Sequence, residues 1–144
     1  MKNISPSLTK VSILLYFSFL FPLILFSQAK GLDCKHVRTG TFYFYPHESK
    51  QQYVIIRDSV LQKEINLKTN DTSLLKINWQ SACIFKTKFI NTTRPQSELE
   101  KSFFNSHVFV IEILFVKNDY YIFKQGLDSL NSKPMVDTLW FKPK

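Results

Sequence analysis

Glycine is scarce in this chain of 144 residues, in which only Gly31, Gly40 and Gly126 occur. Isolated glycines cannot form the Gly-rich loops that hold phosphates, and no Gly-x-Ser-x-Gly nucleophile turn is present. The functions built on those motifs are therefore excluded. Asparagine and aspartate have to supply most backbone positions with positive φ.

Histidine is equally scarce, and His36, His47 and His107 sit on different segments of the chain. No pair of them has the i, i+4 spacing of a zinc-binding helix. We therefore expect neither a metal site nor a cofactor.

Paired carboxylates are the remaining route to catalysis. Asp58 follows Arg57 at a turn, and Glu64 lies beside Lys63 on the polar face of its segment, so both are expected to be solvated surface acids. Glu112 lies among apolar neighbours and has to be paired, hydrogen-bonded or facing a cavity. An enzyme, of small hydrolase type, ranks third among the functions that we consider.

Long hydrophobic runs are absent except at residues 11–26 (VSILLYFSFLFPLILF), which follow Lys2 and Lys10 and precede small residues that end at Ala29. This is the layout of a secretory signal peptide. A membrane-spanning helix usually needs about 20 apolar residues, and this run is shorter and contains Pro22. A cleaved signal is favoured over a retained anchor.

We therefore divide the chain into a signal peptide, residues 1–29, and one domain, residues 30–144, with no membrane span after cleavage. The domain is expected in the periplasm or outside a bacterial cell. Two of the 19 basic residues and none of the 11 acidic residues precede residue 30, which leaves a net charge of +6. No basic cluster suggests nucleic acid as a partner.

Cysteine is limited to Cys34 and Cys83. An even number of cysteines in an exported protein predicts a disulfide. The alternatives are two separate buried thiols or a lipid anchor on Cys34, which the charged Asp33 before it disfavours.

What the chain does have is a series of short runs rich in aromatic and β-branched residues. Such runs at this spacing predict an all-β sandwich or barrel. We expect a single antiparallel meander β-barrel or strongly curled sheet of about eight strands. The runs are residues 37–45, 53–58, 61–68, 73–79, 83–90, 107–116, 120–125 and 135–142.

One segment, residues 96–105, has helical character. Ser97 is a plausible N-cap, and Leu99 and Phe103 are four residues apart. A short helix before the sixth strand is therefore expected.

Apolar and polar residues alternate along several runs, which predicts one dry and one wet face. In residues 61–68, for example, Ile65 and Leu67 alternate with Glu64 and Asn66. We expect the dry interior to contain Phe42, Phe44, Ile55, Ile65, Leu75, Ile77, Trp79, Phe85, Phe89, Phe109, Ile111 and Trp140.

Aromatic residues are abundant after residue 29, with 10 Phe, 5 Tyr and 2 Trp. A small barrel can enclose one apolar ligand. The leading hypothesis is a non-enzymatic binding protein for an apolar small molecule or an envelope component, and the alternative is a protein–protein interaction module acting as an inhibitor or assembly factor. The residues expected to line a pocket are Trp79, Phe85, Phe109, Glu112, Tyr120 and Trp140.

Several short motifs lie along the chain: Cys34, residues 38–42 (RTGTF), Arg57 and Asp58, Lys63 and Glu64, and residues 79–83 (WQSAC). Together they resemble a family of short exported proteins of Bacteroidetes-type bacteria. Where the family often has Tyr two residues after the second cysteine, this chain has Phe85.

The resemblance implies a lipocalin-like barrel with Trp79 and Cys83 near one end, and it implies no ligand or reaction. Some members of the family carry a DNA topoisomerase label. That label does not suit this chain, which has no ATP-binding motif and is too short for strand passage.

Overall fold

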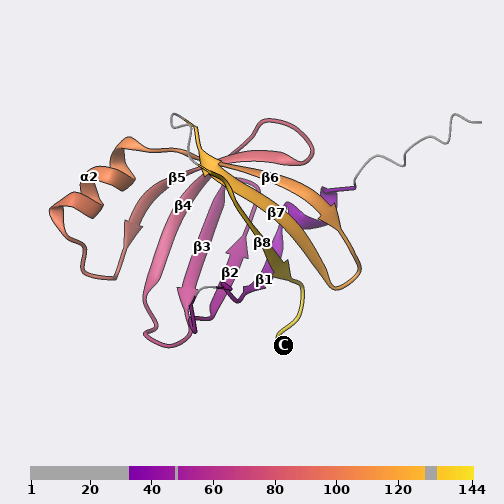
Figure 1. Ribbon diagram of the computed structural model, residues 1–144, viewed down its shortest axis with the longest axis horizontal. Coiled ribbons are helices and arrows are strands. Elements are labelled where there is room, and N and C mark those ends of the chain that lie inside the picture. The colour runs from indigo at the N-terminus through magenta and orange to yellow at the C-terminus, as the bar shows by residue number, and fades with distance from the viewer. Residues whose placement is uncertain (1–32, 48, 129–132) are drawn as a thin grey trace, which may run out of the picture. The chain divides into compact units, whose positions relative to one another are not determined.

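The computed structural model describes residues 33–47, 49–128 and 133–144. In this part of the chain, antiparallel strands in sequence order close into a barrel, because β1 also pairs with β8 (Figure 1). The predicted signal peptide, residues 1–29, lies outside the described residues. The strands are β1 (Gly40–Phe44), β2 (Tyr53–Arg57), β3 (Leu61–Asn66), β4 (Thr72–Trp79), β5 (Ile84–Thr92), β6 (Phe109–Val116), β7 (Tyr120–Leu127) and β8 (Met135–Trp140).

The expected fold class is confirmed: the barrel is an eight-stranded antiparallel meander, and helix α2 (Glu98–Ser106) precedes β6. Each predicted run overlaps one strand, and β4, β5 and β7 extend one or two residues beyond their runs. In the β3–β4 turn Asn70 has a φ of 60°, as expected where glycine is scarce.

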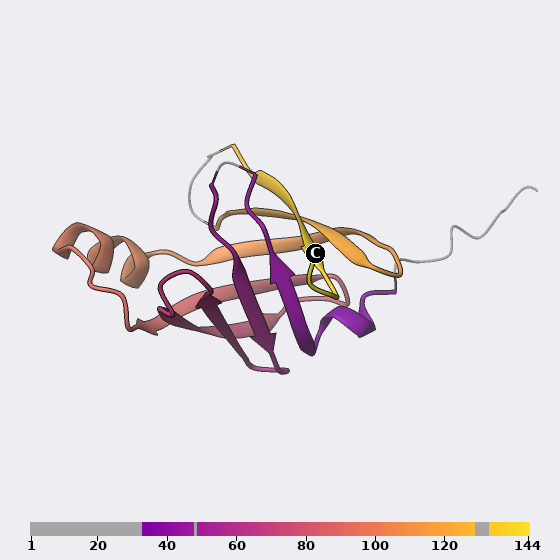
Figure 2. The same ribbon diagram turned by 90° about the horizontal axis from the view of Figure 1, so that it is seen from below.

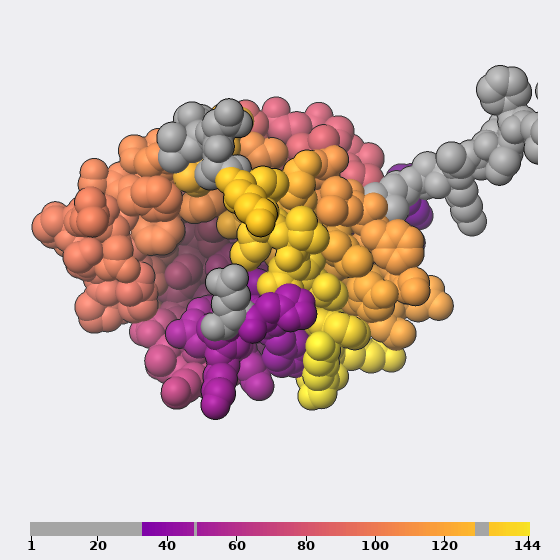
Figure 3. Space-filling model, in the orientation of Figure 1, coloured from indigo at the N-terminus to yellow at the C-terminus, as the bar shows by residue number. Residues whose placement is uncertain are grey.

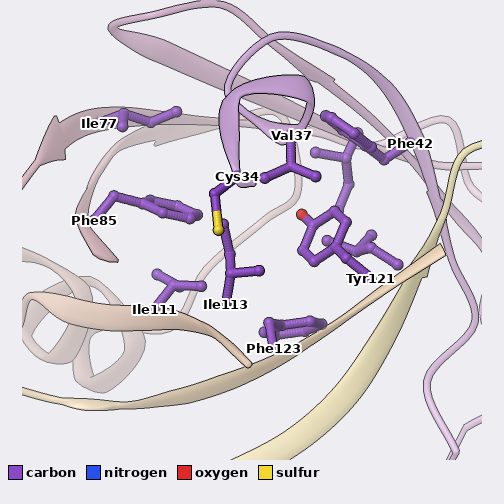
Figure 4. Packing of buried hydrophobic residues seen from close by; sticks show 11 residues of the cluster. Cys34, Val37, Phe42, Ile77, Phe85, Ile111, Ile113, Tyr121 and Phe123 are labelled. Atoms are coloured by element: carbon purple, nitrogen blue, oxygen red, sulfur yellow. The ribbon is translucent and has the colours of Figure 1, made fainter. Parts of the chain in front are cut away.

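A 3-10 turn, η2 (Lys35–Val37), closes one end of the barrel. The predicted disulfide is confirmed, with Cys34 and Cys83 bonded and their Cα atoms 5.3 Å apart. Cys34 and Val37 are almost wholly buried, and they extend from η2 toward Phe85 and Tyr121 (Figure 4). The disulfide therefore holds η2 against the start of β5 as the floor of the barrel.

Helix α2 lies at the opposite end from η2 (Figures 1 and 2). Its N-cap is Ser97, as expected, whose side chain accepts from the backbone N–H of Glu100, while the Glu100 side chain accepts from the backbone N–H of Ser97. This capping box satisfies donors that the first helical turn leaves free. The ring of Phe104 stacks on Phe89 of β5 at 5.1 Å and so attaches the helix to the barrel.

Most of the expected interior is confirmed. The buried members are Phe42, Ile55, Ile77, Phe85 and Ile111, and Phe44, Trp79 and Phe109 pack against them. Leu75 and Phe89 also face inward, where they line internal space.

The predicted orientation of β3 was wrong. Gln62 and Asn66 are buried and Glu64 faces the interior. Ile65, expected inside, instead lies on the outer face, and Leu67 just beyond the strand is 47% exposed.

The β2–β3 pairing explains this orientation. Asp58 accepts hydrogen bonds from the backbone N–H groups of Val60 and Leu61, and the turn that it closes sets Arg57 opposite Gln62 and Ile55 opposite Glu64. Opposite residues of an antiparallel pair share a face. Because Ile55 and Arg57 point inward, their partners on β3 do so as well.

The expected inward position of Trp140 was also wrong. Leu139 is buried and pairs with Phe44 and Tyr121. Successive strand residues point to opposite faces, so Trp140 lies outside, where its ring contacts Tyr120 at 5.0 Å.

The outer side of β6 is partly uncovered at the place where its pairing with β7 shifts register. The shift falls between Ile113 and Phe115, which is the pattern of a β-bulge. Leu114 and Phe115 are both 42% exposed. Residues 107–116, which contain β6, carry apolar side chains on both faces of the strand, but the outer face is therefore not completely buried.

Candidate ligand-binding cavity

A cavity of about 390 Å³ lies in the barrel between the η2 floor and the end that carries α2. Figure 3 shows the surface hollowed between the orange α2 and β5 region and the purple β1–β2 segment. This volume lies within the roughly 300–1,000 Å³ range of small-molecule sites.

One wall of the cavity is polar along its length. Gln62, Glu64 and Asn66 of β3 line it from the floor side to the open side, beside Ser73 of β4 and Thr87 of β5. These side chains offer hydroxyl, amide and carboxyl groups to a ligand.

A chain of hydrogen bonds connects the polar wall to the floor. Arg57 donates through Nη1 to the carbonyl of Val37 at 2.9 Å and through Nε to Oε1 of Gln62 at 2.7 Å. Gln62 in turn donates through Nε2 to Oε1 of Glu64 at 2.6 Å. The chain ties η2 to β2 and orients the carboxyl group of Glu64.

Two aromatic rings cover the guanidinium group of Arg57. Its central carbon lies 5.0 Å from the ring centre of Phe42 and 4.7 Å from that of Phe85. A desolvated cation gains about 2 kcal/mol from such a contact. With only 4% of its surface exposed, Arg57 is largely part of the floor.

Burial changes the pKa values of two titratable groups near Arg57, Glu64 and Tyr121. It raises the pKa of Glu64 above the ordinary value, and this effect exceeds the lowering by the Gln62 hydrogen bond and by the charge of Arg57. Burial also raises the pKa of Tyr121, against a smaller lowering by Arg57. The buried Tyr121 hydroxyl has no hydrogen bond of normal geometry to the described residues.

The other wall of the cavity is largely apolar, although Gln125 of β7 also lines it. Phe44 of β1, Phe109 and Ile111 of β6, Phe123 of β7 and Leu139 of β8 form it. The cavity is therefore amphipathic across its width, with a polar wall that faces an apolar and aromatic one.

A smaller space of about 120 Å³ adjoins the cavity toward α2. Glu64, Phe104 and Phe109 line both spaces. Helix α2 thus contributes a side chain to the wall, and the ligand-accessible region extends from the floor to the helix.

Two further charged residues lie at the open side. Asp71 accepts a hydrogen bond from the Thr69 hydroxyl at 2.6 Å, and Arg94 forms an ion pair with Glu100 at 2.8 Å. The Arg94 hydrogen bond is the main cause of a lowered pKa of Glu100, to about 2.

Two of the residues predicted to line a pocket, Phe85 and Phe109, line the cavity. Trp79 packs on Phe85 with ring centres 4.5 Å apart, and the guanidinium carbon of Arg38 lies 4.6 Å from the centre of the Trp79 ring. Trp79 is therefore adjacent to the cavity wall rather than part of it.

The remaining three predicted residues, Glu112, Tyr120 and Trp140, are not brought into the cavity lining. Glu112 is paired with Lys124 at 2.6 Å and its side chain is 39% exposed. Its neighbours Ile111 and Ile113 take the inward positions, so alternation places Glu112 outside.

Sequence reasoning missed the residues that form the polar wall and its support, above all Arg57, Gln62 and Glu64. One signal was present: Arg57 shares the period-2 face of Tyr53 and Ile55 in residues 53–57. A cation on an otherwise apolar face predicts buried polar partners, and those partners had to come from the next strand.

Within residues 33–47, 49–128 and 133–144, no three His, Cys, Asp or Glu residues are grouped to hold a metal ion. The same part of the chain contains no helix with the length and apolar character needed to span a membrane. The chain matches no protein-family model, no curated protein and no solved structure.

Proposed function

We propose that this protein is a non-enzymatic binding protein whose barrel holds an apolar or amphipathic small molecule, or a component of the bacterial envelope. The observation that carries the proposal is the cavity of about 390 Å³ with aromatic side chains on one wall and hydrogen-bonding groups on the other. A concave site that combines apolar and aromatic side chains with hydrogen-bonding groups is a usual feature of small-molecule recognition.

The proposal includes export from the cytoplasm. The Cys34–Cys83 disulfide supports it, because disulfides persist in oxidising compartments. The intact mass of the protein recovered from its host tests the predicted cleavage after Ala29. A mass that retains residues 1–29, or one with a lipid on Cys34, contradicts it.

A cavity-filling substitution tests the binding function. Leu75 lines the cavity, so Leu75→Trp should abolish the fluorescence gain of the neutral apolar probe N-phenylnaphthylamine. Ile56→Trp is the matched control, since Ile56 lies on the outer face of β2 and its side chain is 45% exposed. Equal probe binding by both variants and the wild type, or no binding by any of them, would contradict the proposal.

Native mass spectrometry of the protein purified from its own host gives a direct second test. The expected result is a small molecule that accompanies the wild-type protein and is lost in Leu75→Trp. Circular dichroism and a thermal melt establish that the variant is folded.

Exposed apolar side chains on helix α2 favour a second candidate function, in which the protein is a protein–protein interaction module. Leu99 on this helix is 82% exposed and Phe103 is 37% exposed. A partner that covers α2 should lose affinity for Leu99→Ser, whereas probe binding inside the barrel should be unchanged. The two functions are thus distinguished by two variants on one protein.

A further inference from the structure

We propose that the cavity selects an uncharged, amphipathic ligand with hydrogen-bond donors along one edge, and that Glu64 is the principal acceptor for these donors. The inference rests on the proposed binding function and extends it by naming the class of ligand. It follows from the distribution of polar groups and charges inside the barrel.

The polar wall argues against a simple hydrocarbon chain as the ligand. Gln62, Glu64 and Asn66 follow one strand along the cavity. Gln62 and Asn66 already form hydrogen bonds within the protein. A hydrocarbon in contact with this strand would still remove water from the carboxyl group of Glu64 without replacing its hydrogen bonds, which is costly. A ligand that supplies donors along the same edge, and an apolar face toward Phe44 and Phe123, matches both walls.

Glu64 is the acceptor that the protein leaves available. Its Oε1 accepts from Gln62, while its Oε2 accepts no hydrogen bond from the described residues. Glu64 lines both the main cavity and the adjoining space. A ligand hydroxyl or amide N–H can therefore reach this carboxyl group from either space.

Arg57 is poorly placed to anchor an anionic ligand. Its Nε and Nη1 already donate to Gln62 and Val37, and the rings of Phe42 and Phe85 lie over the guanidinium group. These contacts use two of the five N–H donors of the guanidinium group, and with 4% of its surface exposed Arg57 offers little area to a ligand.

The two charged residues that lie deepest in the cavity balance one another, since Arg57 is positive and Glu64 is negative when ionised. The other two charged residues among the described lining, Arg94 and Asp71, lie at the open side, where Arg94 is already paired with Glu100. Any net charge on the ligand would then be buried without compensation, which is unfavourable. Charge balance therefore favours a neutral ligand.

A series of probes with the same aromatic body tests the head-group preference of the wild-type protein. Naphthylethanol, naphthylethylamine, naphthylacetate and ethylnaphthalene are each used to displace N-phenylnaphthylamine, at about pH 8.5, well above ordinary carboxyl pKa values. The alcohol should bind with a Kd at least about tenfold lower than that of either charged probe. It should also bind several-fold more tightly than ethylnaphthalene, which has no donor.

Three other rankings of the probes by affinity overturn the inference. If naphthylacetate binds most tightly, Arg57 anchors an anionic ligand. If naphthylethylamine binds most tightly, Glu64 acts as the counter-ion of a cationic ligand. Equal binding of ethylnaphthalene and the alcohol would show that the polar wall is not used. In all three cases the proposed binding function survives, whereas failure of every probe to bind contradicts that function itself.

A charge-neutralising variant provides the second measurement. Glu64→Gln keeps the size of the side chain and removes the negative charge that balances Arg57. Naphthylacetate should then gain about tenfold in affinity relative to naphthylethanol. Glu112→Gln, the same change on the outer face, should leave the ratio unaltered. An unaltered ratio in Glu64→Gln contradicts the inference.

Discussion

At the scale of the residue, Phe85 and Leu75 both line the cavity, but Phe85 is almost wholly buried whereas Leu75 is only partly buried. Phe85 is 1% exposed and contacts Trp79 and Arg57, so Phe85→Ala should destabilise the protein by about 3–5 kcal/mol. Leu75 already borders empty space, so Leu75→Ala should lose clearly less than the 2–5 kcal/mol usual for a packed leucine. Urea unfolding of both variants measures the difference, and equal losses would contradict the presence of the cavity.

Glu64 should make the stability of the protein fall as pH rises. Because burial raises its pKa in the folded state, its contribution is fully present below the unfolded-state value and is lost as pH increases through the folded-state value. Glu64→Gln cannot lose a proton, so its stability relative to the wild type should grow with pH over this range.

Urea midpoints measured at several pH values above the ordinary Glu pKa of 4.5 test this expectation. Glu112→Gln is the control, since Glu112 is paired on the outer face. A stability difference between Glu64→Gln and the wild type that does not change with pH would show that Glu64 stays solvated.

At the scale of the element, helix α2 depends on its capping box and a few aromatic contacts. Ser97→Ala removes the side-chain acceptor of the Glu100 N–H, a change that typically costs about 1 kcal/mol. Because the helix lies at the barrel end, we expect faster hydrogen exchange of its amides with little change in the global melting temperature.

The carboxyl group of Glu100 makes the stability of α2 depend on pH in the direction opposite to the effect of Glu64. Its pKa is lowered to about 2, so its contribution is present above the ordinary Glu value and is lost as pH falls toward 2. Protection of the α2 amides should therefore decrease on acidification in the wild type. Glu100→Gln should show lower protection throughout and a weaker dependence on pH.

At the scale of the whole molecule, the Cys34–Cys83 bond closes a loop with a sequence separation of 49. Chain entropy predicts about 4 kcal/mol of stabilisation for a loop of this length. Replacement of both cysteines by alanine should lower the melting temperature by roughly 15–25 °C. A calorimetric scan with and without reductant provides the check, and identical melting temperatures would contradict it.

Sequence alone determined the features that depend on neighbouring residues. Runs such as residues 53–58 and the Ser97 cap predicted the strands and the helix, because alternation, turns and caps act over a few residues. The pair Cys34 and Cys83 likewise predicted a bond from their number and the expected compartment.

The faces that β3 and β8 present to the interior were decided only by tertiary structure. In β3, one alternating set contains Ile65 and the other contains Gln62 and Glu64, and a shift of one residue exchanges them. Pairing with β2 placed the polar set inside, where the buried Arg57 needs Gln62 as an acceptor. The polar wall therefore arises from the pairing of β3 with β2, and the cavity arises from closure of the barrel, in which β1 pairs with the distant β8.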